Sequence, residues 1–124
     1  SYMEEEFNHK PTGEEIRTLV MSWYNRQTDA AILSGFTYNG ASVWLSVANQ
    51  YNYKAAYDLA VQTGGETLPV TFKFGSDEHP EYHTFSRLDE LKDFYTKAVM
   101  FIEKALAEGW EKKDKFNFEL YRIN

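Results

Sequence analysis

The chain has 124 residues, which is the size of a single domain. It contains no cysteine, so disulfides, thiolate metal sites and cysteine nucleophiles are excluded. Its 19 acidic and 13 basic residues give a net charge of -6, which argues against binding to nucleic acid or to an anionic membrane, because both need basic patches.

Residues 1–11 are predicted to form an acidic amino-terminal tail that ends at Pro11, and residues 12–109 are predicted to form one globular domain. Thr12 and Glu15 have the spacing of a capping box, in which a threonine and a glutamate three residues later satisfy the first amides of a helix. Apolar residues follow at helical spacing as far as Leu33, and Gly35 is expected to end this first helix.

A β-hairpin is predicted directly after the first helix. Asn39-Gly40 separates two short runs, 36–38 and 42–45, that are rich in aromatic and β-branched residues. Both central residues of a type I′ turn need a positive φ, which asparagine and glycine adopt most readily.

A second helix and a second hairpin are predicted next. Ser46 is a suitable cap for a helix of apolar residues at four-residue steps, and Gly64-Gly65 is expected to end it. Residues 68–74 alternate between apolar and polar, which is typical of a strand with one buried face. A polar turn at 75–80 and a return strand at 82–85 complete the hairpin.

Ser86 is predicted to cap the third helix, with Asp89 completing a capping box, and Gly109 is expected to end it. Residues 110–124 form a carboxyl-terminal extension that is either a strand or a short helix. The alternation of Phe116, Phe118 and Leu120 favours the strand.

The order of these elements predicts an α+β fold with about three helices and a small antiparallel sheet built from two β-hairpins. A hairpin, a serine cap and a helix occur twice, at 36–63 and at 70–108, which suggests a tandem ββα arrangement. The two hairpins either join in one sheet or remain apart, and the sequence does not decide between these alternatives.

Several of these motifs together resemble an uncharacterised domain family of tailed bacteriophages and prophages, found in or near tail-fibre-associated proteins. They are the run Ile32-Leu33-Ser34-Gly35-Phe36-Thr37-Tyr38-Asn39-Gly40, the alanine-rich helix after Ser46, the strand Leu68-Pro69-Val70-Thr71-Phe72-Lys73-Phe74, and Thr84-Phe85-Ser86-Arg87-Leu88-Asp89-Glu90-Leu91 with its long helix.

The resemblance covers residues 16–105, and it departs from the family at two places. Phe85-Ser86 stands where Leu-Thr is usual, and Trp44-Leu45-Ser46 stands where many members have a phenylalanine and an aspartate-containing turn. The shared motifs are turns, caps and core aromatics, so the resemblance supports fold more than function. It implies a phage or prophage protein, in the virion or in the host cytoplasm during assembly, and it carries over no catalytic residue and no cofactor.

Two histidines are candidate ligands of a metal ion. His79 and His83 stand close to three acidic residues, and zinc accepts both types of ligand. Pro80 lies between the histidines, so they do not share a helix face, and a solvated hairpin tip accounts for the same residues. We therefore expect no metal and treat these histidines as weak candidates only.

Catalysis is not indicated by any motif. The carboxylates at helix starts are explained by the positive helix end, and no pair of them is placed across a cleft as a glycosidase requires. The serines lack the G-x-S-x-G context of a hydrolase, and the glycines lack the spacing of a phosphate-binding loop. A small hydrolase is therefore the least favoured function, and we predict that the protein is not an enzyme.

Aromatic residues make up 17% of the chain, and tyrosine and tryptophan concentrate in its first half. They either fill the core or form a docking surface, where these side chains combine apolar area with a polar tip. The docking surface predicts binding to other virion or tail-assembly proteins or self-association, and a host-surface glycan is the alternative ligand. The candidates for this surface are Trp23, Tyr24, Tyr38, Trp44, Tyr51, Tyr53 and Tyr57.

Overall fold

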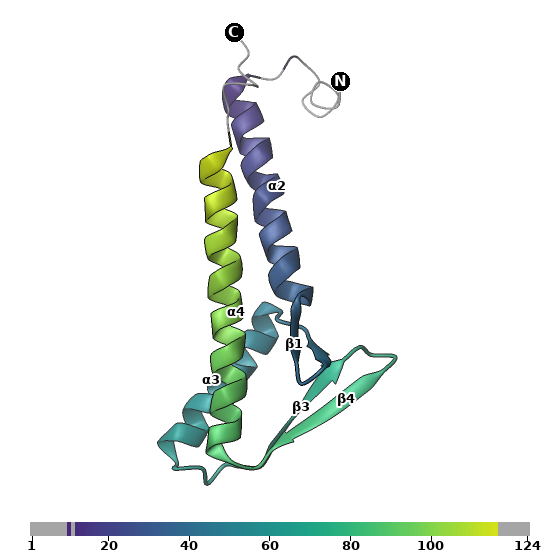
Figure 1. Cartoon of the computed structure of the whole chain (residues 1–124), viewed down its shortest axis with the longest axis vertical. Helices are drawn as coiled ribbons and strands as arrows, with labels where there is room; N and C mark the ends of the chain where they lie inside the picture. Colours follow the sequence, from purple (N-terminus) through teal and green to yellow (C-terminus); the bar gives the residue numbers. More distant parts are fainter. Residues whose placement is uncertain (1–9, 11, 117–124) are drawn as a thin grey trace. The chain divides into compact units, whose positions relative to one another are not determined.

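The structure is a computed structural model that describes residue 10 and residues 12–116. It divides into two compact units, one made of the residues up to Asp29 together with those from Leu106 onward, and the other of Ala30–Ala105. Within the described residues there are three helices and two two-stranded antiparallel sheets, so the predicted α+β class is confirmed (Figure 1). The elements in chain order are α2 (Gly13–Ser34), β1 (Phe36–Tyr38), β2 (Ala41–Val43), α3 (Val47–Gln62), β3 (Val70–Gly75), β4 (Pro80–Phe85) and α4 (Leu88–Lys115).

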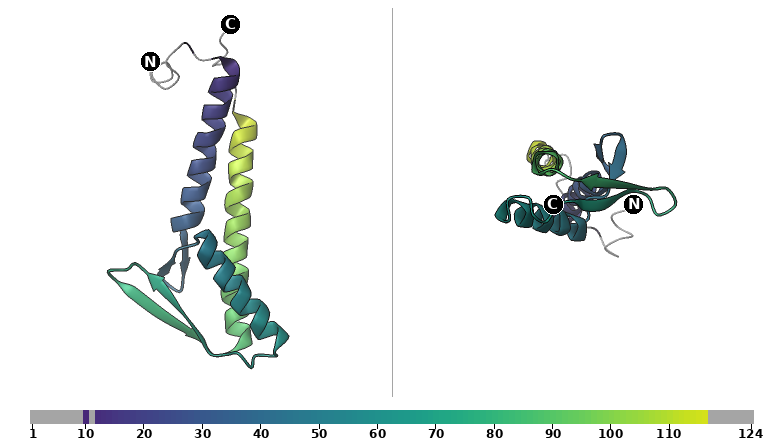
Figure 2. Two further views of the ribbon diagram at one scale, coloured as in Figure 1. Left: turned by 180° about the vertical axis from the view of Figure 1, so that it is seen from behind. Right: turned by 90° about the horizontal axis from the view of Figure 1, so that it is seen from below.

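The first unit pairs the amino-terminal part of α2 with the carboxyl-terminal part of α4. Lys113 Nζ donates a hydrogen bond to Asn25 Oδ1 at 2.9 Å, and the rings of Tyr24 and Phe116 meet edge to face with centroids 5.9 Å apart. Tyr24 meets Phe116, whereas Thr28 lies against Gly109, so these two segments run antiparallel (Figure 2).

The start of α2 follows the predicted capping pattern. The Glu15 backbone amide donates to Thr12 Oγ1 at 3.1 Å, and the Thr12 hydroxyl donates to the Glu15 carboxylate at 3.1 Å. The helix then continues to Ser34 without a break in its polar stretch at 25–29. Of the predicted tail at 1–11, only residue 10 lies among the described residues.

Gly109 lies inside α4 and does not end it, which corrects the sequence prediction. A Cβ atom at this position would collide with the side chain of Thr28 on α2, so the glycine permits a close approach of two helices. The helix continues to Lys115, and the extended conformation favoured for residues 110–115 is wrong there. The remainder of the extension, 117–124, lies outside the described residues.

The second unit begins with the first hairpin, which forms as predicted. Asn39 has φ 50° and Gly40 has φ 83°, the two positive values that a type I′ turn needs. The register pairs Phe36 with Val43 and Tyr38 with Ala41, so both aromatic rings of β1 lie on one face. That face is buried, as Phe36 and Tyr38 are both among the core residues.

Ser46 caps α3 as predicted. The Asn49 backbone amide donates to Ser46 Oγ at 3.1 Å, and the helix ends at Gln62, just before Gly64-Gly65. The ββα order then repeats, as β3 and β4 form a second hairpin that precedes α4.

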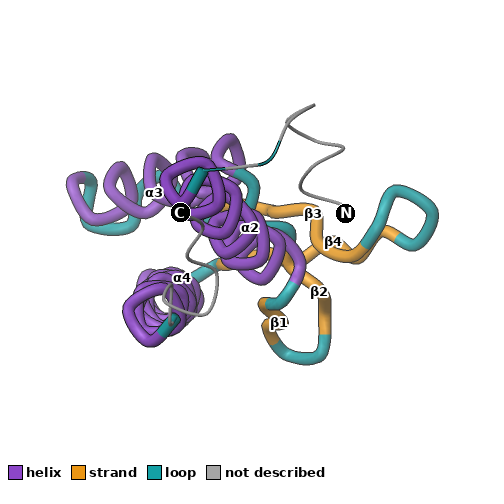
Figure 3. The backbone as a smooth tube through the Cα atoms, turned by 90° about the horizontal axis from the view of Figure 1, so that it is seen from above, coloured by secondary structure: helices purple, strands orange, loops and turns teal. Residues whose placement is uncertain are grey.

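The two hairpins form two separate sheets and not one (Figure 3). The β2 strand lies beside β3 without forming a ladder with it. The strands of the first hairpin are only three residues long, and the chain turns into α3 shortly after Val43. Of the two alternatives left open by the sequence, the structure thus shows the hairpins apart.

The amino-terminal cap of α4 lies one residue later than predicted. The helix begins at Leu88, and the Leu91 amide donates to the carbonyl of Arg87 at 3.2 Å, so the cap position belongs to Arg87. Ser86 therefore precedes the cap. Asp89 instead forms an ion pair with the guanidinium of Arg87, which is the main cause of the lowered pKa of the Asp89 carboxyl.

Phe94 is the centre of the core in the second unit. It is fully buried, at 0% exposure, and its ring centroid lies 5.1–6.4 Å from those of six other aromatic rings. These belong to Phe36, Tyr38, Tyr53, Phe72, Phe74 and Phe85. The helices and hairpins of this unit are thus held by one aromatic cluster. Within residues 12–116, none of the helices combines the length and the apolar composition that crossing a membrane requires.

Candidate functional site

Two of the seven candidate aromatic residues belong to the core, which corrects their assignment to a docking surface. Tyr38 is 6% exposed and Tyr53 is 4% exposed, and both rings contact Phe94. Burial raises the pKa of the Tyr53 hydroxyl. The helical spacing of Tyr53 did not reveal which way it points, because the buried side of α3 is set by β3 and α4.

Tyr38 also carries a polar connection between β1 and α4. Its hydroxyl donates to Asp93 Oδ2 at 2.8 Å, while Lys97 forms an ion pair with the same carboxylate at 3.0 Å. Burial, followed by the hydrogen bond and the negative charge of Asp93, raises the pKa of Tyr38 to about 12. The hydrogen bond from Tyr38, followed by that from Lys97, lowers the pKa of Asp93. Tyr38, Asp93 and Lys97 have a structural role, because each forms a hydrogen bond or an ion pair with another of the three.

We expect Tyr38→Phe to lower the free energy of unfolding at neutral pH by about 1 kcal/mol, the net contribution of one hydrogen bond. Folded Tyr38 keeps its proton up to about pH 12, whereas the unfolded chain loses it near pH 10. The stabilisation is therefore complete below about pH 10 and is lost as the pH rises to about 12. Urea unfolding of both proteins over this range should show the wild-type advantage shrinking.

The control for this comparison is Tyr82→Phe, which removes an exposed hydroxyl from β4 and should leave stability at neutral pH unchanged. A wild-type advantage over Tyr38→Phe that persists undiminished at the alkaline end would contradict the linkage.

Tyr24 and Tyr57 are half-buried and already have ring partners. Tyr24 contacts Phe116 in the first unit, and Tyr57 stacks on Tyr95 with centroids 4.7 Å apart and an interplanar angle of 19°. Trp23 is exposed on α2 and lies edge to face against Tyr24 at 5.0 Å. In the second unit this leaves Tyr51 and Trp44 as the candidates that present an exposed aromatic ring.

Tyr51 belongs to an apolar stripe on α3, defined by Val47, Tyr51, Ala55 and Leu59. These residues recur every four positions and all face solvent, with Val47 84% exposed, Tyr51 75% and Leu59 49%. Val47 and Tyr51 are the two most exposed large apolar side chains among the described residues. The apolar residues whose four-residue spacing predicted this helix therefore lie on its solvent-exposed side.

A groove of about 290 Å³, here called the helix groove, lies between α3 and α4 beside this stripe. Two of its polar side chains have partners within the protein, since Gln50 Nε2 donates to the carbonyl of Leu45 at 2.8 Å and Lys54 pairs with Asp58. The remaining walls are apolar or aromatic, so the groove suits an apolar occupant. Its lining consists of Leu45, Val47, Gln50, Tyr51, Tyr53, Lys54, Tyr95, Ala98, Val99 and Ile102.

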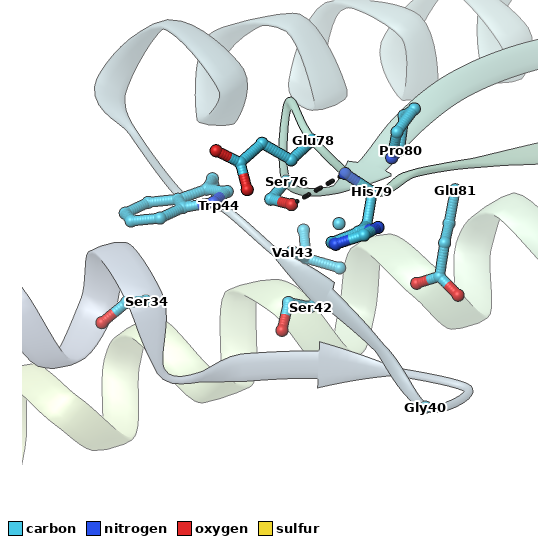
Figure 4. A pocket seen from close by; sticks show the side chains of 11 residues that line it. Ser34, Gly40, Ser42, Val43, Trp44, Ser76, Glu78, His79, Pro80 and Glu81 are labelled. Atoms are coloured by element: carbon cyan, nitrogen blue, oxygen red, sulfur yellow. Dashed lines mark hydrogen bonds between the residues drawn. The ribbon is translucent and has the colours of Figure 1, made fainter.

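Trp44 lies in a second hollow, the hairpin pocket, between the two hairpins (Figure 4). The pocket has a volume of about 740 Å³ and is larger and more polar than the helix groove. Glu78 and Glu81 of the second hairpin contribute carboxylates to it. The full lining is Ser34, Gly40, Ser42, Val43, Trp44, Gly75, Ser76, Glu78, His79, Pro80 and Glu81.

The two histidines weighed as metal ligands have different surroundings. His79 lines the hairpin pocket, whereas His83 lies on β4 among the rings of Tyr38, Phe74 and Phe85, the last at 4.5 Å. Among the described residues there is no group of three or more metal-ligating side chains. The arrangement therefore does not support a metal site in the described part of the chain.

Sequence reasoning missed the partners that surround Tyr51 and Trp44. Val99 and Ile102 line the helix groove from α4, far from Tyr51 in the chain, and no local pattern connects them. Glu78 and Glu81 were noted only as neighbours of the histidines. Their place beside Trp44 depends on the packing of one hairpin next to the other.

Comparison of the chain with family models, with curated proteins and with solved structures finds no match. The similarity to a phage domain family therefore stays a prediction from its motifs.

Proposed function

We propose that this chain is a non-catalytic protein-interaction module that docks another protein through the apolar stripe and the helix groove of α3 and α4. The observation that supports this proposal is the stripe itself. Surface apolar residues are ordinary when scattered singly, but a continuous row beside an apolar groove is typical of an interface.

The geometry of the stripe favours a helix as the docked segment. Residues spaced by four positions form a ridge along a helix, and such ridges pack into the grooves between the side chains of a neighbouring helix. Val47 and Tyr51 lie one turn apart on this ridge and also edge the helix groove. An amphipathic helix could cover both features with apolar side chains at three- and four-residue spacing.

Another protein is a better occupant than a second copy of this chain. Each copy carries a net charge of -6, so two copies repel each other, whereas a neutral or basic partner does not. Since Gln50 and Lys54 already have partners within the protein and the other lining residues are apolar or aromatic, the occupant gains mainly from burying apolar area. The family resemblance suggests virion or tail-assembly proteins as the class of partner.

The pKa shifts of the carboxyl groups support a non-catalytic function. A catalytic acid at neutral pH needs a raised pKa. The described carboxyl groups with a clearly shifted pKa are Asp89 and Asp93, and ion pairs and hydrogen bonds lower both. Asp93 joins α4 to the first hairpin through Tyr38, and Asp89 forms an exposed ion pair with Arg87 at the start of α4, so both carboxyl groups already have partners within the protein.

Tyr51→Ala should weaken binding to the partner at least tenfold, because truncating an aromatic anchor typically costs about 2 kcal/mol or more of binding energy. The candidate partners are the proteins encoded next to this one, tested one by one with purified components by isothermal titration calorimetry. Tyr82→Ala is the matched control, since it removes an exposed tyrosine from β4, away from α3, and should bind like the wild type.

The proposal fails if Tyr51→Ala binds the partner as tightly as the wild type, or if none of the neighbouring proteins binds. It also fails if analytical ultracentrifugation shows a stable dimer that Tyr51→Ala dissociates, because the stripe would then join two copies of this chain.

A further inference from the structure

The hairpin pocket carries negative charge that the protein does not compensate. Its lining contains the carboxylates of Glu78 and Glu81 but no lysine or arginine. Neither carboxylate has an ion-pair or hydrogen-bond partner among the residues that the structure describes, whereas the adjacent Asp77 pairs with Lys73 at 3.1 Å. Uncompensated carboxylates around a hollow attract cations and repel anions.

Trp44 forms the aromatic wall of the same pocket. Its side chain is 45% exposed, and within residues 12–116 it makes no ring contact and no side-chain hydrogen bond. The backbone on which it stands is fixed, because Asn49 Nδ2 donates to the Trp44 carbonyl at 2.9 Å and the Leu45 amide donates to the Leu33 carbonyl at 3.1 Å. The backbone that carries this ring therefore has a defined position at the end of the first hairpin.

The opposite wall is a tight turn whose shape is also fixed. The His79 amide donates to Ser76 Oγ at 3.0 Å, and the Ser76 amide donates to the His79 carbonyl at 3.3 Å (Figure 4). This turn carries Glu78 at its tip and leads into β4, where Glu81 stands. The backbone of both walls is therefore held before a ligand binds, and binding has to order only the side chains.

We propose that the hairpin pocket binds an arginine side chain presented by another polypeptide. The planar guanidinium group stacks on an aromatic face and at the same time donates hydrogen bonds to a carboxylate, so it matches Trp44 and the carboxylate of Glu78, which points toward this ring (Figure 4). Glu81 lies on the far side of His79 and adds its negative charge to the pocket. The ammonium group of lysine is compact and strongly hydrated and gains less from stacking. A neutral glycan would also stack on Trp44, but it would leave both negative charges uncompensated.

The first test compares two synthetic peptides of the same length, acetyl-Gly-Arg-Gly-Arg-Gly-amide and its citrulline counterpart. Citrulline keeps the shape of arginine and removes its charge. Calorimetric titration of the full chain should show the arginine peptide binding about tenfold more tightly or better, with an affinity that falls as the salt concentration is raised.

The second test assigns the site. The double variant Glu78→Gln/Glu81→Gln and the single variant Trp44→Leu should each weaken binding of the arginine peptide about tenfold. Asp77→Asn is the matched control, because it removes a negative charge from the same turn outside the pocket lining, and it should change the affinity less than about twofold. Circular dichroism verifies that each variant is folded.

The inference is overturned if the citrulline peptide binds equally well, or if the glutamine variant binds like the wild type. Binding of a neutral oligosaccharide that depends on Trp44 and not on the two glutamates would also overturn it, in favour of glycan recognition. Tyr51→Ala should bind the arginine peptide unchanged, so this site and the docking surface on α3 are tested independently.

Discussion

Phe94→Ala is expected to lower the free energy of unfolding by about 3–5 kcal/mol, the largest effect of any single substitution considered. Phe94 is fully buried and contacts aromatic rings from both hairpins and from α3, so its removal leaves a cavity that no single neighbour fills. A domain of this size has a total stability of about 5–15 kcal/mol, so the variant should be close to its unfolding limit.

Urea unfolding followed by far-ultraviolet circular dichroism measures this loss. Phe94→Leu, which keeps most of the apolar volume, should cost only about 1–2 kcal/mol. Tyr82→Ala, which truncates an exposed ring, should stay within about 0.5 kcal/mol of the wild type. A Phe94→Ala variant as stable as Tyr82→Ala would contradict the central position of this ring in the core.

Gly75→Ala is expected to lower the free energy of unfolding by about 2–5 kcal/mol, from two separate causes. Gly75 has φ 80°, a left-handed conformation that alanine adopts only at a cost of about 1–2 kcal/mol. A Cβ atom there would also collide with the carbonyl oxygen of His79, and backbone cannot rotate away as a flexible side chain can. The overlap adds about 1–3 kcal/mol.

Gly40→Ala separates the two causes. Gly40 has a similar φ of 83°, but a Cβ atom built there has no neighbour within 4 Å. Gly40→Ala should therefore lower the free energy of unfolding only by the cost of the left-handed conformation, about 1–2 kcal/mol. Equal losses for the two alanine variants, measured by urea unfolding, would show that the turn at 75–80 relaxes freely. The hairpin pocket would then have one adaptable wall.

The two proposed sites draw on different parts of the same unit. The stripe on α3 offers apolar area and is insensitive to charge, whereas the hairpin pocket depends on Glu78 and Glu81. A partner that presents an amphipathic helix and an arginine-bearing segment would use both, and the variants described above distinguish each contribution. Such division between apolar anchor and charged contact is usual at protein interfaces, where charge contributes specificity and association rate.

The seven aromatic candidates show which part of the docking surface could be predicted from the sequence. Composition alone indicated an excess of tyrosine and tryptophan, and Tyr51 and Trp44 are indeed exposed in the second unit. Tyr38 and Tyr53 are buried instead, because the aromatic cluster around Phe94 needs rings from β1 and α3. Whether a ring lies inside or outside depends on which elements cover it, and no periodicity within one element contains that information.

The sequence by itself determined the local structure of this protein. The cap at Thr12, the type I′ turn at Asn39-Gly40 and the cap at Ser46 formed as predicted, because each depends on hydrogen bonds and φ angles within a few residues. These local preferences were sufficient for the order of the elements and for the α+β class.

Only the tertiary structure decided the features that need distant partners. A glycine after an apolar run usually ends a helix, but α4 continues through Gly109. This glycine instead permits close contact between α4 and Thr28 of α2. The hairpins form two separate sheets that lie next to each other, and this packing brings Trp44 and Glu78 to one pocket. Both outcomes depend on packing between segments far apart in the chain, which local spacing does not encode.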